Sequence, residues 1–286
     1  MKMKKLVAMV ATATMAMTLL AGCGGGGAEE AGSATSAAAE SDSNVVVVGT
    51  NPTFEPFEYQ DDEGNMTGFD LDLMTAIGED QGFEVEFESL EFDALVGALG
   101  TGQIDVIASG MSITPERLKS VAFAEPYMDA SLGIMVAEDS DIDGADALDG
   151  KVVAAQIGTT GADEATALQE DGKIKEAKVL DNYNTCIQEL LNGGVDAIII
   201  DIPVAQSFMN KQDGKVKLVG EPAVADYYGL AIDKENTELV EKVNAGLANL
   251  IENGKYDELC EKYDLTASEA IKDGSASAKI DELAAE

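Results

Sequence analysis

The sequence has 286 residues, of which 45% are hydrophobic, so the chain is long enough for two domains of about 100 residues that each bury a core. Its formal net charge of −36 argues against binding to nucleic acid, whose phosphates would repel it, and against anionic membrane surfaces. Histidine is absent, and no Cys-x-x-Cys spacing offers a thiolate site, so no metal or cofactor is expected.

The first 43 residues predict an export signal followed by a tether. A basic start, Met1–Lys5, precedes an uncharged run of 15 residues that is short for a membrane span. The segment Leu20-Ala21-Gly22-Cys23 then resembles the lipobox of bacterial lipoproteins, in which the cysteine is acylated. We therefore interpret residues 1–22 as a lipoprotein signal peptide, Cys23 as the lipidation site and residues 23–43 as a disordered tether.

From residue 45 onward, short apolar runs alternate with helical patterns, which favours α/β sheets rich in parallel strands. The first set predicts strands at 45–49, 85–87 and 105–108 and helices at 69–82 and 93–100. The second set predicts strands at 152–155, 179–180 and 197–200 and helices at 162–170 and 186–191. Extended runs follow at 131–137 and 228–232, and the pattern ends with helices at 239–252 and 257–263.

Because the alternation occurs twice, we expect two α/β lobes joined by two crossing strands. The first lobe would comprise residues 44–131 and 226–286, and the second lobe residues 132–225. The polar tail after Ser268 is expected to fray. In open α/β sheets, ligands lie beyond the carboxyl ends of the strands. That rule selects the loops after Gly49, Ala108, Ala155 and Ile200.

Arg117 is the only arginine among 18 basic residues, and it falls in one of these loops. The spacing predicts a helix that starts at Pro115 with Thr114 as its N-cap, which places Arg117 in the first turn. A cation there opposes the helix dipole, whereas helix N-termini favour anions. A carboxylate shared between Arg117 and nearby backbone amides would offset that conflict. The alternative is an ordinary surface arginine.

The other loops offer complementary groups. The loop after Gly49 presents an amide and aromatic rings, and the Gly/Thr turn after Ala155 forms an anion-binding nest. Asp201 directly follows an apolar run, and it is either an acid for an ammonium group or the cap of the next helix. A free amino acid needs donors for its α-carboxylate and an acid for its α-ammonium. The loops together therefore indicate a site for an amino acid.

Four segments resemble the family 3 solute-binding proteins of amino-acid ABC transporters. They are residues 48–79, which include the motif GFDLDL, SGMSITPER at 109–117, KVVAAQIGTTGADE at 151–164 and GGVDAIIID at 193–201. The resemblance covers residues 44–265 in the same order. It implies a two-lobed periplasmic-binding-protein-like clamp of type II, which is not an enzyme and closes on a free polar or basic L-α-amino acid.

By the same resemblance, Arg117 binds the α-carboxylate with help from Ser112 and the backbone of Thr160. Asp201 and the carbonyl region of Gly110 take the α-ammonium. Phe54 and Phe92 flank the ligand side chain, and the other positions that line the pocket are Asn51, Ser109, Gln156 and Gly161. The GFDLDL motif is expected to serve helix packing.

One position departs from the family pattern. Many members have an acid where Asn51 stands, which weakens the case for a cationic ligand, and Glu55 is the candidate that would compensate. No second arginine is present for a second carboxylate, so glutamate and aspartate are disfavoured as ligands.

The implied partners are a free amino acid and the ABC permease, with a monomer held outside the cell membrane by lipidated Cys23. Two alternatives stay open. The same fold serves as an enzyme in the related cyclic-acid dehydratases, which would require Glu55 or a lysine as general acid. A sensory domain that acts on a separate kinase is the other. Cys186 and Cys260 are either buried free thiols or a disulfide.

Overall fold

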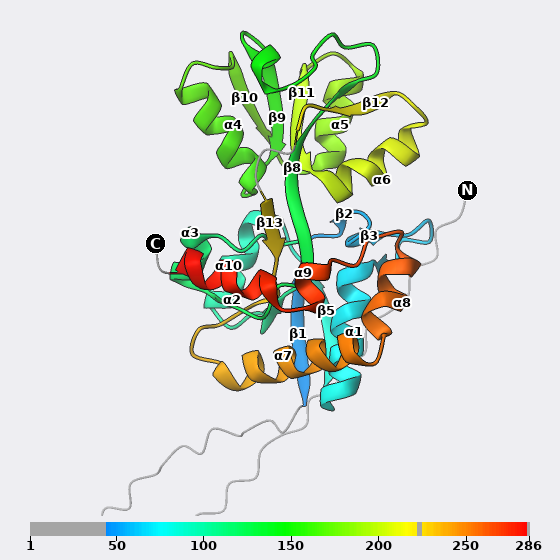
Figure 1. Cartoon of the computed structure of the whole chain (residues 1–286), viewed down its shortest axis with the longest axis vertical. Helices are drawn as coiled ribbons and strands as arrows, with labels where there is room; N and C mark the ends of the chain where they lie inside the picture. The colour runs from blue at the N-terminus through cyan, green and yellow to red at the C-terminus, as the bar shows by residue number, and fades with distance from the viewer. Residues whose placement is uncertain (1–43, 222–224, 285–286) are drawn as a thin grey trace, which may run out of the picture. The chain divides into compact units, whose positions relative to one another are not determined.

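The computed structural model describes residues 44–221 and 225–284, and two sheets organise this part of the chain into two lobes (Figure 1). The predicted signal peptide, the lipidation site Cys23 and the tether lie outside the described residues. None of the helices in the described part combines the length and the apolar character that crossing a membrane requires.

The first lobe is built on a five-stranded sheet in the order β5-β1-β6-β14-β7. Strands β5 (Glu84–Ser89), β1 (Val45–Thr50) and β6 (Val106–Ile107) are parallel, because helical crossovers connect them. Strand β14 (Ala231–Ile232) runs antiparallel to both β6 and β7 (Ala122–Phe123). The carboxyl ends of β1 and β6 therefore share one edge, at which residues 51 and 108–112 emerge.

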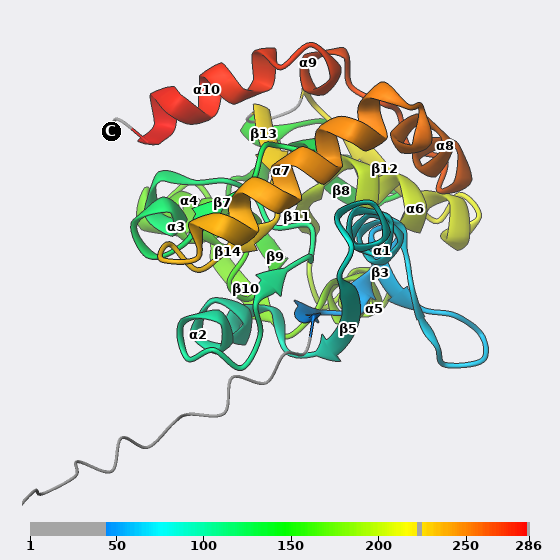
Figure 2. The ribbon, with the colours of Figure 1, turned by 90° about the horizontal axis from the view of Figure 1, so that it is seen from below.

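Helices cover this sheet and connect its strands. They are α1 (Phe69–Gln81), η1 (Phe92–Ala94), α2 (Leu95–Gly100), α3 (Pro115–Ser120), α7 (Thr237–Glu252) and α8 (Lys255–Lys262). Helices α7 and α8 pack against α1, and Figure 2 shows α7 crossing the lobe beside it. A Cβ at Gly246 of α7 would lie 2.8 Å from Ile77 of α1, so glycine permits this close packing.

The second lobe has a sheet in the order β10-β9-β11-β8-β12. Strands β10 (Glu176–Leu180), β9 (Val152–Gln156) and β11 (Ala197–Asp201) are parallel, and β12 (Val216–Val219) joins the far edge through β8. All five residues of β11 are buried, as expected of a strand covered on both faces. The remaining elements are η2 (Ala145–Leu148), α4 (Thr160–Glu170), α5 (Tyr183–Leu191) and α6 (Ile202–Gln212).

The long strand β8 (Met128–Ala137) runs from one lobe into the other (Figure 1). Its first half pairs with β13 (Ala225–Tyr228) and its second half pairs antiparallel with β11 and β12. The predicted fold class, two α/β lobes in a type II clamp, is confirmed. Both sheets are mixed, because β8 and β14 enter them antiparallel.

A hairpin and the chain terminus complete the first lobe. Strands β2 (Thr53–Phe54), β3 (Glu58–Gln60) and β4 (Met66–Thr67) form a small sheet. The expectation that the tail frays is wrong, since residues 269–284 form α9 (Glu269–Lys272) and α10 (Ser275–Ala284). These helices stay ordered because they bury apolar side chains such as Ile271 against the lobe.

The two cysteines in the described residues are buried free thiols. Cys186 lies on α5 and Cys260 on α8, in different lobes. Burial disfavours the thiolate and raises the pKa of Cys186 to about 12 and that of Cys260 to about 11. Of the two alternatives left by the sequence, the free-thiol interpretation is confirmed.

Candidate binding site between the lobes

A small cavity lies where the loops after β1, β6, β9 and β11 meet. The residues that line it come from both lobes and are Asn51, Phe54, Glu58, Phe92, Gly110, Ser112, Arg117, Gln156, Thr159, Thr160 and Asp201. The space they enclose is about 10 Å³, which is room for one water molecule. An amino acid is larger, so it requires the lobes or the lining side chains to move apart.

Arg117 spans the seam between the lobes. Thr114 caps α3 by accepting a hydrogen bond from the backbone N–H of Arg117 at 3.2 Å, as the sequence predicted. The guanidinium donates through Nη1 to the carbonyl of Ser112 at 2.7 Å and through Nη2 to the carbonyl of Gly158, in the second lobe, at 2.9 Å. Its carbon atom Cζ lies 5.6 Å from the centre of the Phe92 ring. The planar fork is therefore held at the cavity by both lobes.

Asp201 enters the same cavity from the second lobe. It is the last residue of β11 and occupies the N-cap position of α6, yet its side chain makes no capping hydrogen bond. The carboxyl group is buried and lies beside the hydroxyl of Tyr228. Burial and then the charge of Asp201 raise the pKa of Tyr228 well above its ordinary value. The sequence left open that Asp201 serves only as a helix cap, but its side chain does not cap α6.

The Phe54 ring packs against Gly110 and forms an aromatic part of the cavity lining. The Phe54 ring lies 5.7 Å from that of Tyr183 in the second lobe and 6.3 Å from that of Tyr228. Gly110 has a positive φ of 49°, and a Cβ there would lie 2.5 Å from the Phe54 ring. Any larger residue would push the ring aside, so glycine is required at this position.

An amide network joins the lobes on the other side of the cavity. The side-chain oxygen of Asn51 accepts hydrogen bonds from Thr53 at 2.7 Å and from Gln156, on β9, at 3.2 Å. The amide nitrogen of Asn51 donates to the carbonyl of Leu90 at 2.8 Å. Asn51 therefore holds its neighbours in place and bridges to the second lobe, and it supplies no charge.

Nine of the eleven predicted ligand residues line the cavity. Ser109 lies behind the wall, where it accepts from the backbone of Asn51 and donates to Glu58, both at 3.0 Å. Gly161 lies in α4, where a Cβ would be 2.9 Å from the carbonyl of Ile199, so its size serves helix packing. Thr159, which the sequence analysis did not name, caps α4 by accepting from Ala162.

Of the two acids Glu55 and Glu58, Glu58 lines the cavity and Glu55 does not. Glu55 forms an ion pair with Lys211 on α6, whose ammonium lies 5.7 Å from the Tyr59 ring centre. Glu58 pairs directly with Phe54 across the hairpin, and cross-strand partners share a face of the sheet. A hairpin register assigned from the turn at residues 55–57, which joins β2 to β3, would have placed Glu58 beside Phe54 in advance.

Glu58 is fully buried and lies against a second buried acid, Asp70. Burial, followed by the charge of Asp70, raises the pKa of Glu58 well above its ordinary value. Asp70 accepts hydrogen bonds from the backbone N–H of Gly110 at 2.8 Å and the hydroxyl of Tyr127 at 2.7 Å. Burial outweighs these bonds and raises the pKa of Asp70 to about 6.

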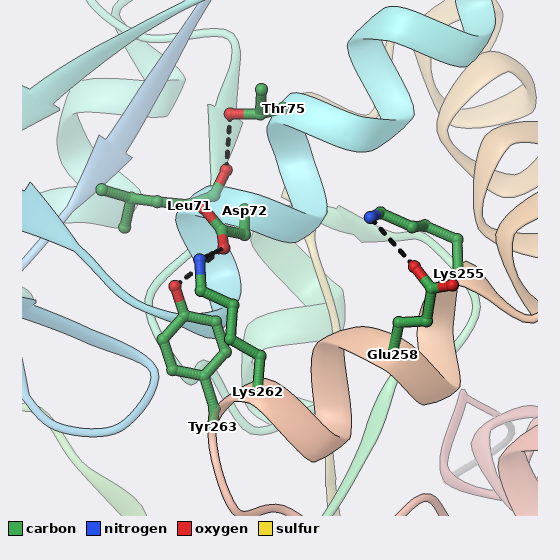
Figure 3. Close-up of polar contacts among 7 residues, drawn as sticks. All are labelled: Leu71, Asp72, Thr75, Lys255, Glu258, Lys262 and Tyr263. Atoms are coloured by element: carbon green, nitrogen blue, oxygen red, sulfur yellow. Dashed lines mark hydrogen bonds and ion pairs between the residues drawn. The ribbon is translucent and has the colours of Figure 1, made fainter.

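The two acids of the GFDLDL motif have different surroundings. Asp72 faces away from the cavity and accepts from the ammonium of Lys262 and, at 2.8 Å, from the hydroxyl of Tyr263, which tie α1 to α8 (Figure 3). The expected role in helix packing therefore fits Asp72. Asp70 instead holds the loop that carries Gly110 and contacts Glu58.

Two α/β lobes that meet at a cavity lined by an arginine and two acids define a ligand-binding clamp. Residues 46–266 match the bacterial extracellular solute-binding proteins, family 3, and the chain belongs to that family. Proteins of this family bind solutes outside the cytoplasm and are not enzymes.

Relatives and solved structures agree with this assignment. A probable histidine-binding protein of Campylobacter jejuni is 34% identical over 76% of this chain and 84% of its own length. An ancestral arginine-binding protein bound to arginine has a TM-score of 0.74 at 38% identity, covering 77% of this chain and 98% of its own. An ancestral arginine-binding protein bound to glutamine gives 0.73 at 38% identity, with 77% and 97% covered.

Proposed function

We propose that the chain is the substrate-binding lipoprotein of an amino-acid ABC importer, and that it binds a free basic or polar L-α-amino acid between its lobes. One observation carries the proposal: Arg117 and Asp201 reach the same cavity from different lobes. Opposite charges on facing lobes match the two charged ends of an amino acid. Binding such a ligand would therefore hold the lobes together.

The fork of Arg117 is the proposed partner of the α-carboxylate. It now donates to two backbone carbonyls, of which that of Gly158 belongs to the other lobe. A carboxylate is a stronger acceptor than a carbonyl, so a ligand that enters the opened seam would take over these donors. Ser112 and Thr160 would complete the carboxylate site, and Asp201 and the carbonyl of Gly110 would accept the α-ammonium.

The charge of the remaining wall favours a basic or polar side chain. Phe54 and Phe92 would flank the aliphatic part, and Glu58, Asn51 and Gln156 would contact its polar end. The wall holds two acids against one arginine, so a second ligand carboxylate would be repelled. The names of the relatives support the same classes, since they report histidine, arginine and glutamine as ligands.

The permease would recognise the closed state of the lobes, which is stabilised by contacts between them. Two such contacts that leave the donors of Arg117 to the ligand are Gln156 to Asn51 and Lys211 to Glu55. A ligand that binds both lobes favours the state in which these contacts form, and a permease that recognises that state would receive loaded protein.

Calorimetric titration against the common amino acids tests the binding proposal. Basic and amide-bearing amino acids should bind, and Arg117→Ala should abolish binding. Lys119→Ala is the matched control, because Lys119 is an exposed residue of the same helix that pairs only with Glu116. An Arg117→Ala protein with unchanged affinity for the best amino acid would contradict the assignment of the site.

Membrane anchoring is tested separately. Cells that express the full chain and are fed labelled palmitate should incorporate label into the protein, and Cys23→Ser should remove the label and release the protein from the membrane. For the enzymatic alternative, the acid named from the sequence, Glu55, is paired with Lys211 and does not line the cavity.

A further inference from the structure

Glu58 and Asp70 present an unusual pair of oxygen atoms to each other. Each carboxyl group has one oxygen that accepts known donors: Ser109 for Glu58, and Gly110 and Tyr127 for Asp70. The other oxygens, Oε2 of Glu58 and Oδ1 of Asp70, are buried and receive no hydrogen from any donor in the described residues. Ser109 and Gly110 are adjacent in the chain, so the two buried carboxyl groups that they hold lie beside each other.

Two ionised carboxylates have no hydrogen between them, so the two buried oxygens without a donor can bond to each other only through a shared proton. Two buried negative charges in contact would also repel each other strongly, which is the usual reason that paired carboxyl groups share one proton. The described groups that surround Glu58 add no cation next to it: they are Asp70 from α1, Tyr127 before β8, Asp201 from β11, Tyr228 from β13 and, across the cavity, Arg117.

The hydrogen-bond donors around Glu58 and Asp70 indicate which of the two carboxyl groups is ionised. Asp70 lies in the first turn of α1, where the helix dipole favours a negative charge, and it accepts two hydrogen bonds. Glu58 accepts one, from Ser109, and only Glu58 lines the cavity. The charged form therefore belongs to Asp70 and the proton to Glu58, in agreement with the raised pKa of Glu58, to which the charge of Asp70 contributes after burial.

We infer that Glu58 and Asp70 share one proton, and that a ligand with a cationic side chain displaces it, so that such a ligand binds with release of a proton whereas a neutral ligand does not. This inference rests on the proposed function. The O–H bond of Glu58 breaks, the proton passes to the buffer, and the ligand's cation takes its place beside the carboxylate. Asp70 thereby acts as a positioning residue, because it sets the charge of Glu58 in the cavity lining.

The coupling between ligand binding and proton release can be measured. Binding of L-arginine should be followed by calorimetry between pH 5 and 8 in pairs of buffers with different ionisation enthalpies, with L-citrulline as the neutral probe of similar shape. Arginine should release up to one proton, and its affinity should rise up to tenfold per pH unit below the pKa of Glu58. Citrulline should release none, and its affinity should not rise with pH.

Two variants locate the proton. Glu58→Gln should remove the proton release. Asp70→Asn keeps an acceptor for Gly110 and Tyr127 and offers an N–H to Glu58, so it should let Glu58 ionise and move the proton release to lower pH. Arginine binding without proton release at every pH in the unmodified protein would overturn the inference.

A spectroscopic measurement separates this inference from the proposed function. The infrared carbonyl band of a protonated, buried carboxylic acid should be present near pH 7 without any ligand and should disappear in Glu58→Gln. Absence of this band would overturn the shared proton even if arginine binds. If the band is present but arginine does not bind, the shared proton is supported. The basic ligand and its exchange with the proton are then both refuted.

Discussion

Replacing Arg117 by lysine keeps the positive charge at the seam and removes the planar fork. In the structure the fork makes two hydrogen bonds in different directions, to Ser112 at 2.7 Å and to Gly158 at 2.9 Å, and stacks on Phe92. A lysine ammonium is a point charge that cannot reproduce both directions in one plane. Arg117→Lys should therefore weaken binding of every amino acid that binds.

The magnitude follows from the contacts. A hydrogen bond to a charged group contributes about 1.5–3 kcal/mol, and lysine retains one of the two. Loss of the stacked guanidinium over Phe92 adds about 0.5–1 kcal/mol. The expected cost is about 2–4 kcal/mol, or roughly a 30- to 900-fold higher dissociation constant.

Calorimetric titration of the best amino acid ligand measures this cost, with Lys119→Met as the control from the same helix. Helix α3 buries none of its residues, so the thermal midpoint of Arg117→Lys without ligand should stay close to that of the unmodified protein. A folded Arg117→Lys protein whose dissociation constant lies within threefold of the original would refute the role of the fork.

Three further outcomes are expected. Asp201→Asn keeps the shape and removes the charge, so calorimetry should show about ten- to hundredfold weaker binding, a loss of one charged hydrogen bond; equal affinity would remove Asp201 from the site. Lys211→Met removes an exposed ion pair across the seam and should weaken binding at most about fivefold, whereas Lys178→Met, which breaks a pair inside the second lobe, should leave affinity unchanged. Asp70 has its pKa raised to about 6 from 3.8, so the folded state binds that proton more tightly, and the associated stability is present at low pH and is lost as pH rises through 6. Urea unfolding at pH 4.5 and 7.5 should therefore show a loss of about 2 kcal/mol that is smaller in Asp70→Asn, and an identical loss in both proteins would contradict the raised pKa.

Much of the fold could be predicted because local patterns decide it. The helix expected at 69–82 is α1 (Phe69–Gln81), and the apolar run 197–200 is the buried core of β11. The cap and first turn around Arg117 were also predicted, since Thr114 and Pro115 determine them from neighbouring residues. Strand β12 and the terminal helices were not predicted, because these short segments are ordered by contacts with distant parts of the chain.

The choice between Glu55 and Glu58 shows where sequence reasoning stopped. Glu55 follows β2 and Glu58 begins β3, and only the register of this hairpin decides which side chain lies opposite Phe54. The ion pair of Glu55 involves Lys211, which lies 156 residues away in the sequence. No local pattern contains that contact.

The sequence by itself determined two α/β lobes and the four loops that meet between them, two of which carry Arg117 and Asp201. These depend on hydrophobic periodicity, caps and strand ends, which neighbouring residues specify. Only the tertiary structure decided that Asp201 leaves its helix uncapped, that Glu58 faces the cavity and that Asp70 lies against Glu58. The physical reason is that side-chain direction, burial and the sharing of a proton depend on groups that the folded chain brings together from distant segments.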